Sequence, residues 1–132
     1  MTQRDMEYIP VLYRNIQRNK AHLRYLIDKA LSTAMTPMDR ERVQTSRHNI
    51  SIEYSIEAAD LDQEIREMEL RLKGLQEGIP ELIDELDDAL EKKVVKLRYI
   101  KCYNWDVVAE LTGYAERHIY RVNENIMARL EP

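Results

Sequence analysis

Arginine, histidine, tyrosine and asparagine side chains gather in one short stretch near the C-terminus, which reads NWDVVAELTGYAERHIYRVNENI over residues 104–126. Arg117 and Arg121 are one helical turn apart, so a helix would present both guanidinium groups on one side. A guanidinium group can donate two hydrogen bonds to guanine and so read sequence, or bind a phosphate and only position the helix. These residue types predict a surface that reads double-stranded DNA, formed by Arg117, His118, Tyr120, Arg121 and Asn125.

Two short helices around Gly113 would position these side chains. We expect the first helix to begin at Trp105, with Asn104 as its cap, because a side-chain oxygen can accept a hydrogen bond from a free amide of the first turn. Gly113 supplies the positive φ that a sharp turn needs, and Tyr114 should pack under the turn. The second helix should start near residue 115 or 116, with an apolar arc opposite to the arginines that consists of Ala115, Ile119, Val122 and Ile126.

Two helices joined by a Gly turn, the second with an outward basic face, are typical of the helix-turn-helix. The major groove of DNA is about 12 Å wide and admits one α-helix, so the second helix could enter it. The same pattern also occurs in helical bundles, so a packing motif without DNA is the alternative interpretation.

Apolar residues follow a heptad repeat in the acidic middle of the chain. The repeat consists of Tyr54, Ala58, Leu61, Ile65, Met68, Leu72, Leu75 and Ile79. Such a narrow seam buries little by itself and requires a second helix. The N-terminal segment has a matching repeat, with Asn19 in a gap where a polar residue can fix the register. Its apolar members are Leu12, Ile16, Leu23, Leu26 and Ala30.

We therefore predict an N-terminal long-helix hairpin or coiled coil, and leave open whether the helices pair within one chain or between two chains. Between them, the segment LSTAMTPMDRERVQTSRHN over residues 31–49 is expected to be a loop, because it holds Pro37 and many Ser, Thr and Arg residues. This segment holds Arg40, Arg42 and Arg47. These arginines could be solvated side chains of a connecting loop or, as an alternative, could make an accessory contact to phosphate.

A helix boundary is expected at residues 78–80, which read Gly-Ile-Pro, since Gly often follows a helix and Pro favours the first turn of the next. From Glu81 a single helix should run through Leu97, with acidic residues in its early turns and basic residues in its late turns, as the helix dipole favours. The predicted domains are a helical oligomerisation region over residues 1–79 and a helix-turn-helix DNA-binding domain over residues 80–132.

The composition of the 132-residue chain favours an all-α fold, because only 3 Gly and 4 Pro provide few turns. The net charge of −4 is spread unevenly. Residues 51–91 hold 14 acidic and 3 basic side chains, whereas residues 92–132 hold 8 basic and 5 acidic ones. A nucleic-acid partner for the C-terminal part is therefore compatible with the negative net charge of the whole chain.

Several functional classes lack the residues that they need. The sequence has no Gly-rich phosphate loop, and His22, His48 and His118 are too scattered for a metal site. Cys102 is the single cysteine, so no internal disulfide is possible, which favours a reducing compartment. Neither a signal peptide nor a membrane-spanning segment is expected. We expect a cytoplasmic protein that is not an enzyme and uses no cofactor or metal.

The segment VVKLRYIKCYNWDVVAELTGYAERHIYRVNENIMARL resembles the DNA-binding region 4 of bacterial sigma-70-type factors. Together with the RVQTS segment at residues 42–46 and the acidic heptad helix, it makes the chain resemble small phage and prophage-encoded transcriptional regulators related to the RinA and ArpU activators. This resemblance implies a sigma region 4-like helix-turn-helix that controls phage late or packaging genes in a bacterial host cell. One departure is Ala115, which stands where the pattern usually has a capping Ser.

Three hypotheses follow from the sequence. The first is a sequence-specific transcriptional regulator, dimeric through its helical hairpin, whose two recognition helices read half-sites about one helical turn apart. The second is a phage DNA-packaging component that resembles a small terminase subunit and forms a ring of many copies. The third is an adaptor whose apparent recognition helix binds bacterial RNA polymerase, and such binding would survive high salt, unlike a phosphate-dominated contact.

Overall fold

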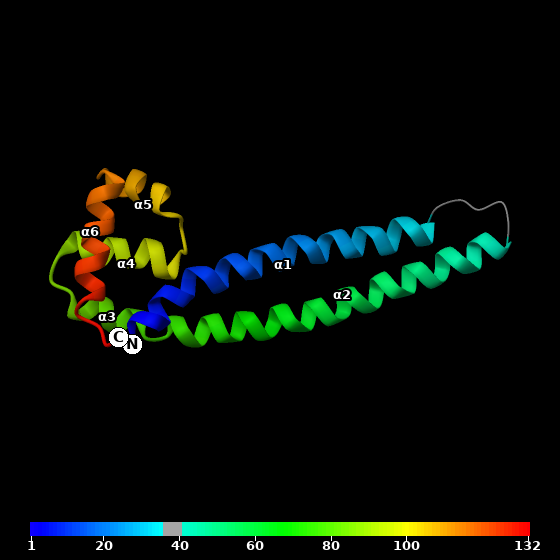
Figure 1. Cartoon of the computed structure of the whole chain (residues 1–132), viewed down its shortest axis with the longest axis horizontal. Helices are drawn as coiled ribbons and strands as arrows, with labels where there is room; N and C mark the ends of the chain where they lie inside the picture. The colour runs from blue at the N-terminus through cyan, green and yellow to red at the C-terminus, as the bar shows by residue number, and fades with distance from the viewer. Residues whose placement is uncertain (36–40) are drawn as a thin grey trace. The chain divides into compact units, whose positions relative to one another are not determined.

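The computed structural model describes the backbone of residues 1–35 and 41–132, and the side chains of these residues except those between 34 and 47. The described residues contain no β-strand, only one isolated bridge between Thr2 and Glu131. The predicted all-α fold is confirmed (Figure 1). In chain order the elements are α1 (Gln3–Met35), α2 (Glu41–Gln76), α3 (Ile79–Glu85), α4 (Ala89–Val95), a π-helical turn η1 (Lys96–Ile100), α5 (Trp105–Thr112) and α6 (Glu116–Met127).

The chain divides into two compact units. The first unit combines Met1–Arg14 with Leu70–Pro132, and the second unit is Asn15–Glu69. The domain boundary expected between residues 79 and 80 therefore falls inside the first unit. The physical reason is that the first turns of α1 supply Met6 and Ile9, both fully buried, to the core of the C-terminal helices.

The second unit is an antiparallel hairpin of α1 and α2, which run side by side within one chain (Figure 1). The Oγ atom of Ser51 donates a 2.8 Å hydrogen bond to the carbonyl oxygen of Ala30, and the Nδ2 atom of Asn19 lies 3.4 Å from the sulfur of Met68. These contacts connect the two predicted heptad seams. The seam residues that are buried in this unit are Ile16, Leu26, Ala30, Ala58 and Ile65.

The loop expected over residues 31–49 is wrong for the described backbone. Helix α1 continues to Met35, and α2 already begins at Glu41. Ala, Leu and Met have high helix propensity, so residues 30–35 extend α1 despite the Ser and Thr among them. Pro37 and the side chains of the three arginines in this segment lie outside the described residues.

In the first unit, α3, α4, η1, α5 and α6 surround one core with the start of α1. The Nε2 atom of Gln3 donates to the carbonyl oxygens of Met127 and Leu130 at 2.8 and 3.4 Å. The carbonyl oxygen of Met127, in the last turn of α6, also accepts from the amide of Leu130 at 3.0 Å. The chain ends are thereby tied together, as the markers in Figure 1 show. The buried core consists of Met6, Ile9, Ile79, Leu82, Leu86, Val94, Val95, Tyr99, Cys102, Val108, Ala109, Ile119, Val122, Ile126 and Met127.

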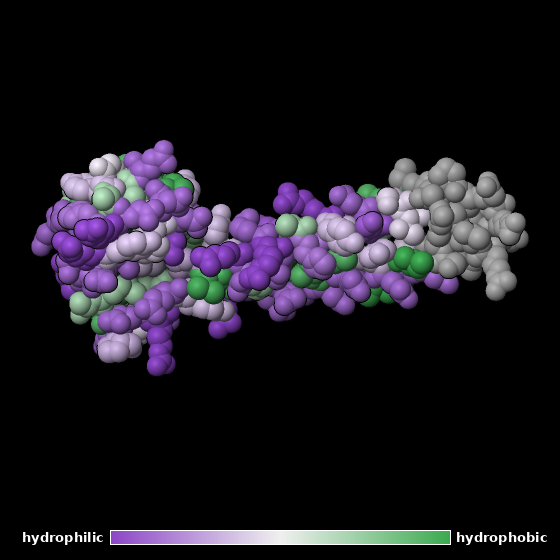
Figure 2. Space-filling model, turned by 45° about the horizontal axis from the view of Figure 1, so that its top comes forward, coloured by the Kyte–Doolittle hydropathy of each residue, from purple (hydrophilic) through white to green (hydrophobic). Residues whose placement is uncertain are grey.

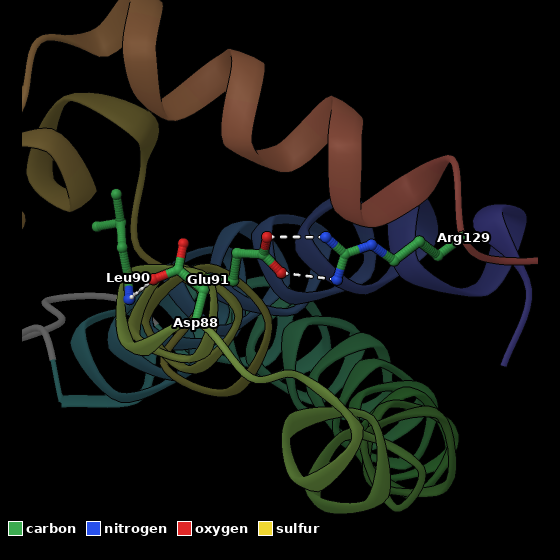
Figure 3. A network of polar contacts seen from close by, with 4 residues as sticks. All are labelled: Asp88, Leu90, Glu91 and Arg129. Atoms are coloured by element: carbon green, nitrogen blue, oxygen red, sulfur yellow. Dashed lines mark hydrogen bonds and ion pairs between the residues drawn. The ribbon is translucent and has the colours of Figure 1, made fainter.

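The boundary expected at residues 78–80 is confirmed, because α2 ends at Gln76 and α3 starts at Ile79 with Pro80 in its first turn. The single helix expected from Glu81 to Leu97 is wrong, since α3 ends at Glu85 and α4 begins at Ala89. Leu86 turns to an extended backbone and is buried. The Oδ1 atom of Asp88 accepts a 3.0 Å hydrogen bond from the amide of Leu90 and caps α4 (Figure 3).

Candidate nucleic-acid interface

Helices α5 and α6 are joined by the sharp turn that the sequence predicts. Gly113 has a φ of +79°, and its amide donates a 2.9 Å hydrogen bond to the carbonyl oxygen of Ala109. Glycine adopts this left-handed conformation without the strain that a Cβ atom brings. The side-chain cap expected from Asn104 is wrong: Asn104 precedes α5, but only its backbone oxygen accepts, from the amide of Val108 at 3.0 Å.

Helix α6 starts at Glu116, as expected, and Ala115 occupies the capping position without a side-chain hydrogen bond. The backbone oxygen of Ala115 accepts from the amides of His118 and Ile119 at 3.0 and 3.1 Å. Glu116 in the first turn places a negative charge where the helix dipole favours it. Ala115 itself is exposed, so the apolar arc of α6 consists of Ile119, Val122 and Ile126, all buried.

The opposite face of α6 is exposed. All five residues predicted to read DNA are exposed, and Arg117 and Arg121 make no hydrogen bond or ion pair within the part of the chain that the structure describes. Arg129, just past the helix, differs sharply. It binds both carboxylate oxygens of Glu91 at 2.8 and 2.9 Å (Figure 3). The two predicted arginines therefore keep all their donors available for a ligand.

A shallow groove of about 440 Å³ runs along this face. It brings together three of the predicted residues and adds two carboxylates that the sequence analysis missed. The available signal was spacing, since residues 116, 120 and 124 recur every four positions and share one side of a helix. The groove is lined by Glu116, Arg117, Tyr120, Arg121 and Glu124, whereas Asn125 and His118 lie outside it.

Two aromatic contacts hold residues at the edges of this face. The ring of Tyr114 stacks on that of His118 with 4.9 Å between centroids, so the expectation that Tyr114 packs under the turn is wrong: its side chain is 48% exposed. The ring of Tyr120 meets Trp105 edge to face at 5.4 Å. Both contacts restrict side-chain rotamers before any ligand binds, which lowers the entropy cost of binding.

Behind Trp105, the guanidinium group of Arg98 lies 4.5 Å from the ring centroid. Its Nη1 atom donates to the carbonyl oxygen of Tyr103 at 2.9 Å, and its Nε atom is buried without a hydrogen-bond partner in the described residues. Burial lowers the pKa of Arg98, although its neighbour Tyr99 partly opposes this shift. Arg98 thus supports Trp105 rather than serving as a free cation at the surface.

Tyr99 and Cys102 belong to the core under this interface. Burial raises the pKa of Tyr99 to about 12, and its hydroxyl donates to Asn123 of α6. Cys102 has a φ of +58° and is buried, and burial raises the pKa of its thiol. The Nε2 atom of Gln76, at the end of α2, donates to the carbonyl oxygen of Tyr99 at 3.0 Å and so supports this bend.

No protein-family model, curated protein or solved structure matches this chain. Across residues 1–35 and 41–132, no helix is long and apolar enough to cross a membrane. The described residues contain no group of three or more His, Cys, Asp or Glu side chains that could hold a metal ion. The resemblance to phage regulators therefore stays a prediction.

Proposed function

We propose that α5, Gly113 and α6 form a helix-turn-helix that places α6 in the major groove of double-stranded DNA. The observation that carries this proposal is the pair of exposed arginines, Arg117 and Arg121, which have no polar partner among the described residues and lie on a helix whose other face is buried. At 12 residues, α6 is about 18 Å long, which suits one crossing of the groove. Arg117, Arg121 and Tyr120 are the proposed base contacts, with His118 and Asn125 at the edges.

The proposed role is that of a sequence-specific transcriptional regulator in a bacterial host cell, one that acts on phage late or packaging genes. The resemblance of residues 94–130 to sigma region 4 supports this context. Two copies would place two α6 helices on half-sites about one helical turn apart. No catalytic residue or cofactor is part of the proposal.

The test is a fluorescence anisotropy titration with DNA from the neighbourhood of the gene and with scrambled DNA, at two salt concentrations. We expect tight binding to one natural fragment that weakens steeply with salt, because phosphate contacts release counterions. The Arg117→Ala/Arg121→Ala variant should lose this tight binding. The control, Arg18→Ala/Lys73→Ala, removes the same charge from exposed positions of α1 and α2. Equal binding by both variants, or no binding by the wild type, would reject a DNA-reading α6.

A second candidate is an adaptor that binds bacterial RNA polymerase. It is favoured by the apolar and aromatic side chains that the helix-turn-helix exposes, Leu111 and Tyr114 at nearly half of their surface and Tyr120 slightly less. Glu116 and Glu124 in the α6 groove also reduce its attraction for phosphate. Binding of core polymerase that persists at high salt, without affinity for DNA, would select this candidate.

A further inference from the structure

The second unit carries an open groove between α1 and α2 that DNA binding does not use. Its volume is about 440 Å³, and Leu23 and Ile65 contribute its apolar part. The two helices bring opposite charges to it, and one pair, Lys20 and Glu69, forms an exposed ion pair of 3.7 Å. The charged lining residues are Lys20 and Arg24 from α1, and Asp62 and Glu69 from α2.

The side of the hairpin with this groove continues into exposed aliphatic side chains. On α1, Ile27 and Leu31 follow Arg24 at spacings of three and four residues, which keeps all three on one side of the helix. On α2, Ile52 precedes Asp62 by ten residues, about 80° short of three full turns, so Ile52 borders the side of the helix that carries Asp62. The hydrogen bond between the neighbouring residues 30 and 51 puts the aliphatic side chains at the same level of the hairpin.

These aliphatic side chains are exposed. Ile27 is 43% exposed, Leu31 55% and Ile52 44%. Single exposed apolar residues are normal, but a group that is rimmed by charges marks an interaction site. Figure 2 shows strongly apolar residues at the surface of the hairpin among hydrophilic ones. We name this surface the hairpin face and define it by Lys20, Arg24, Ile27, Leu31, Ile52 and Asp62.

The charge distribution on the hairpin face indicates which partner it fits. The face is basic along α1 and acidic along α2, so it is complementary to itself. An interface between identical copies around a two-fold axis needs such self-complementarity. Stacking α1 of one copy on α2 of another brings opposite charges together, whereas stacking α1 on α1 brings like charges together.

We propose that the hairpin face binds a second copy of this chain, with α1 of each copy antiparallel to α2 of the other. The two hairpins then form a four-helix bundle. Ile27 and Leu31 of one copy pack against Ile52 of the second copy, and Arg24 lies near Asp62 of the second copy. This surface specifies the dimer of the proposed function and does not require DNA to bind.

The first test is analytical ultracentrifugation of the full chain over a range of micromolar concentrations. The wild type should form a dimer, and Ile52→Glu should weaken its association at least tenfold, because it places a charge in the apolar part of the face. The matched control is Val11→Glu, since Val11 is also 44% exposed but lies outside the hairpin face. Circular dichroism verifies that each variant keeps its helices.

A monomeric wild type, a larger ring, or a dimer that is equally stable in Ile52→Glu would each overturn the proposal. Disulfide cross-linking tests the pairing itself. A mixture of Ile27→Cys and Ile52→Cys chains should cross-link between the two variants, while cross-linking of Ile27→Cys alone would indicate α1 on α1 and reject the arrangement. Cys102 is buried and gives a low background.

The two proposals fail separately. Dimerisation that depends on Ile52 in a protein without affinity for DNA would reject only the proposed function. Conversely, a wild type that binds DNA strictly as a monomer would reject the hairpin face and the two half-sites, but not the reading of DNA by α6.

Discussion

The hydroxyl of Tyr99 donates a 2.6 Å hydrogen bond to Oδ1 of Asn123 and thereby ties η1 to the middle of α6. Asn123 lies between the buried Val122 and the exposed Glu124, at the edge of the groove-bearing face. The bond acts together with the buried side chains of α6 to hold one face of the helix on the core, and this orientation decides which side chains face outward. The orientation of the proposed reading face thus depends on a residue outside the helix-turn-helix.

Replacing Tyr99 by Phe should lower the free energy of unfolding by about 1 kcal/mol, the usual net value of a hydrogen bond to a neutral partner. The ring keeps its place in the core, and water can reach the half-buried Asn123. Urea denaturation, followed through the fluorescence of the single tryptophan, measures the change. An unchanged midpoint would show that the bond contributes nothing to stability.

Tyr99 also predicts a loss of stability at alkaline pH. Its pKa rises from the usual value of about 10 in the unfolded chain to about 12 in the fold, because burial disfavours the phenolate. A raised folded pKa stabilises the fold fully below pH ~10, and this contribution disappears as the pH rises through 12. Two pKa units correspond to about 2 to 3 kcal/mol.

Other tyrosines and lysines titrate in the same range, so the measurement is a comparison. Unfolding free energies at about pH 9 and about pH 11.5 should differ more in the wild type than in Tyr99→Phe. Equal pH dependence of the two proteins would contradict the assignment to Tyr99.

The cap of α4 gives a prediction with a control next to it in the sequence. Asp88→Ala should destabilise the protein by about 0.5 to 2 kcal/mol, since the amide of Leu90 loses its side-chain acceptor. Asp87→Ala removes the same charge from an exposed position without a cap bond and should change stability by less than about 0.5 kcal/mol. Thermal unfolding of both variants tests this; equal effects would mean that charge, not capping, matters.

The helix break before Asp88 also shows what could not be predicted from the sequence. Spacing alone predicted the heptad seams and the buried arc of α6, because each follows from a period within one helix. The residue type of Gly113 predicted the turn. The break at Leu86 could not be seen, since Leu82, Leu86 and Leu90 continue an unbroken helical period. Tertiary packing determines this break, because Leu86 is buried in an extended conformation.

Contacts between residues far apart in the sequence could not be predicted either. The side chain of Gln3 donates hydrogen bonds to carbonyl groups 124 and 127 residues away in the sequence, and no local sequence pattern predicts such contacts. In the candidate site, the arginines were visible as residue types in a short basic stretch. The carboxylates of Glu116 and Glu124 were not predicted as part of the site, although their four-residue spacing with Tyr120 places all three on the side of α6 that lines one groove.

Those carboxylates carry the last prediction, which concerns specificity and rests on the proposed DNA binding. Glu124 lines the α6 groove beside Tyr120 and Arg121. A carboxylate repels phosphate and can accept a hydrogen bond from the amino group of cytosine, so it should oppose non-specific binding and favour a particular base. Glu124→Gln should therefore bind scrambled DNA more tightly and lose about 1 kcal/mol, roughly fivefold, of discrimination.

Glu110→Gln provides the matched control, because Glu110 is exposed on α5 and outside the groove, and its change alters the net charge equally. Titrations of both variants with natural and scrambled DNA at one fixed salt concentration separate the electrostatic contribution of the carboxylate from its contact with a base. A purely electrostatic effect would strengthen binding to both DNAs by the same factor in both variants. Only a residue that faces the base edges would change the ratio of the two affinities, so an unchanged ratio in Glu124→Gln would place this carboxylate away from the bases.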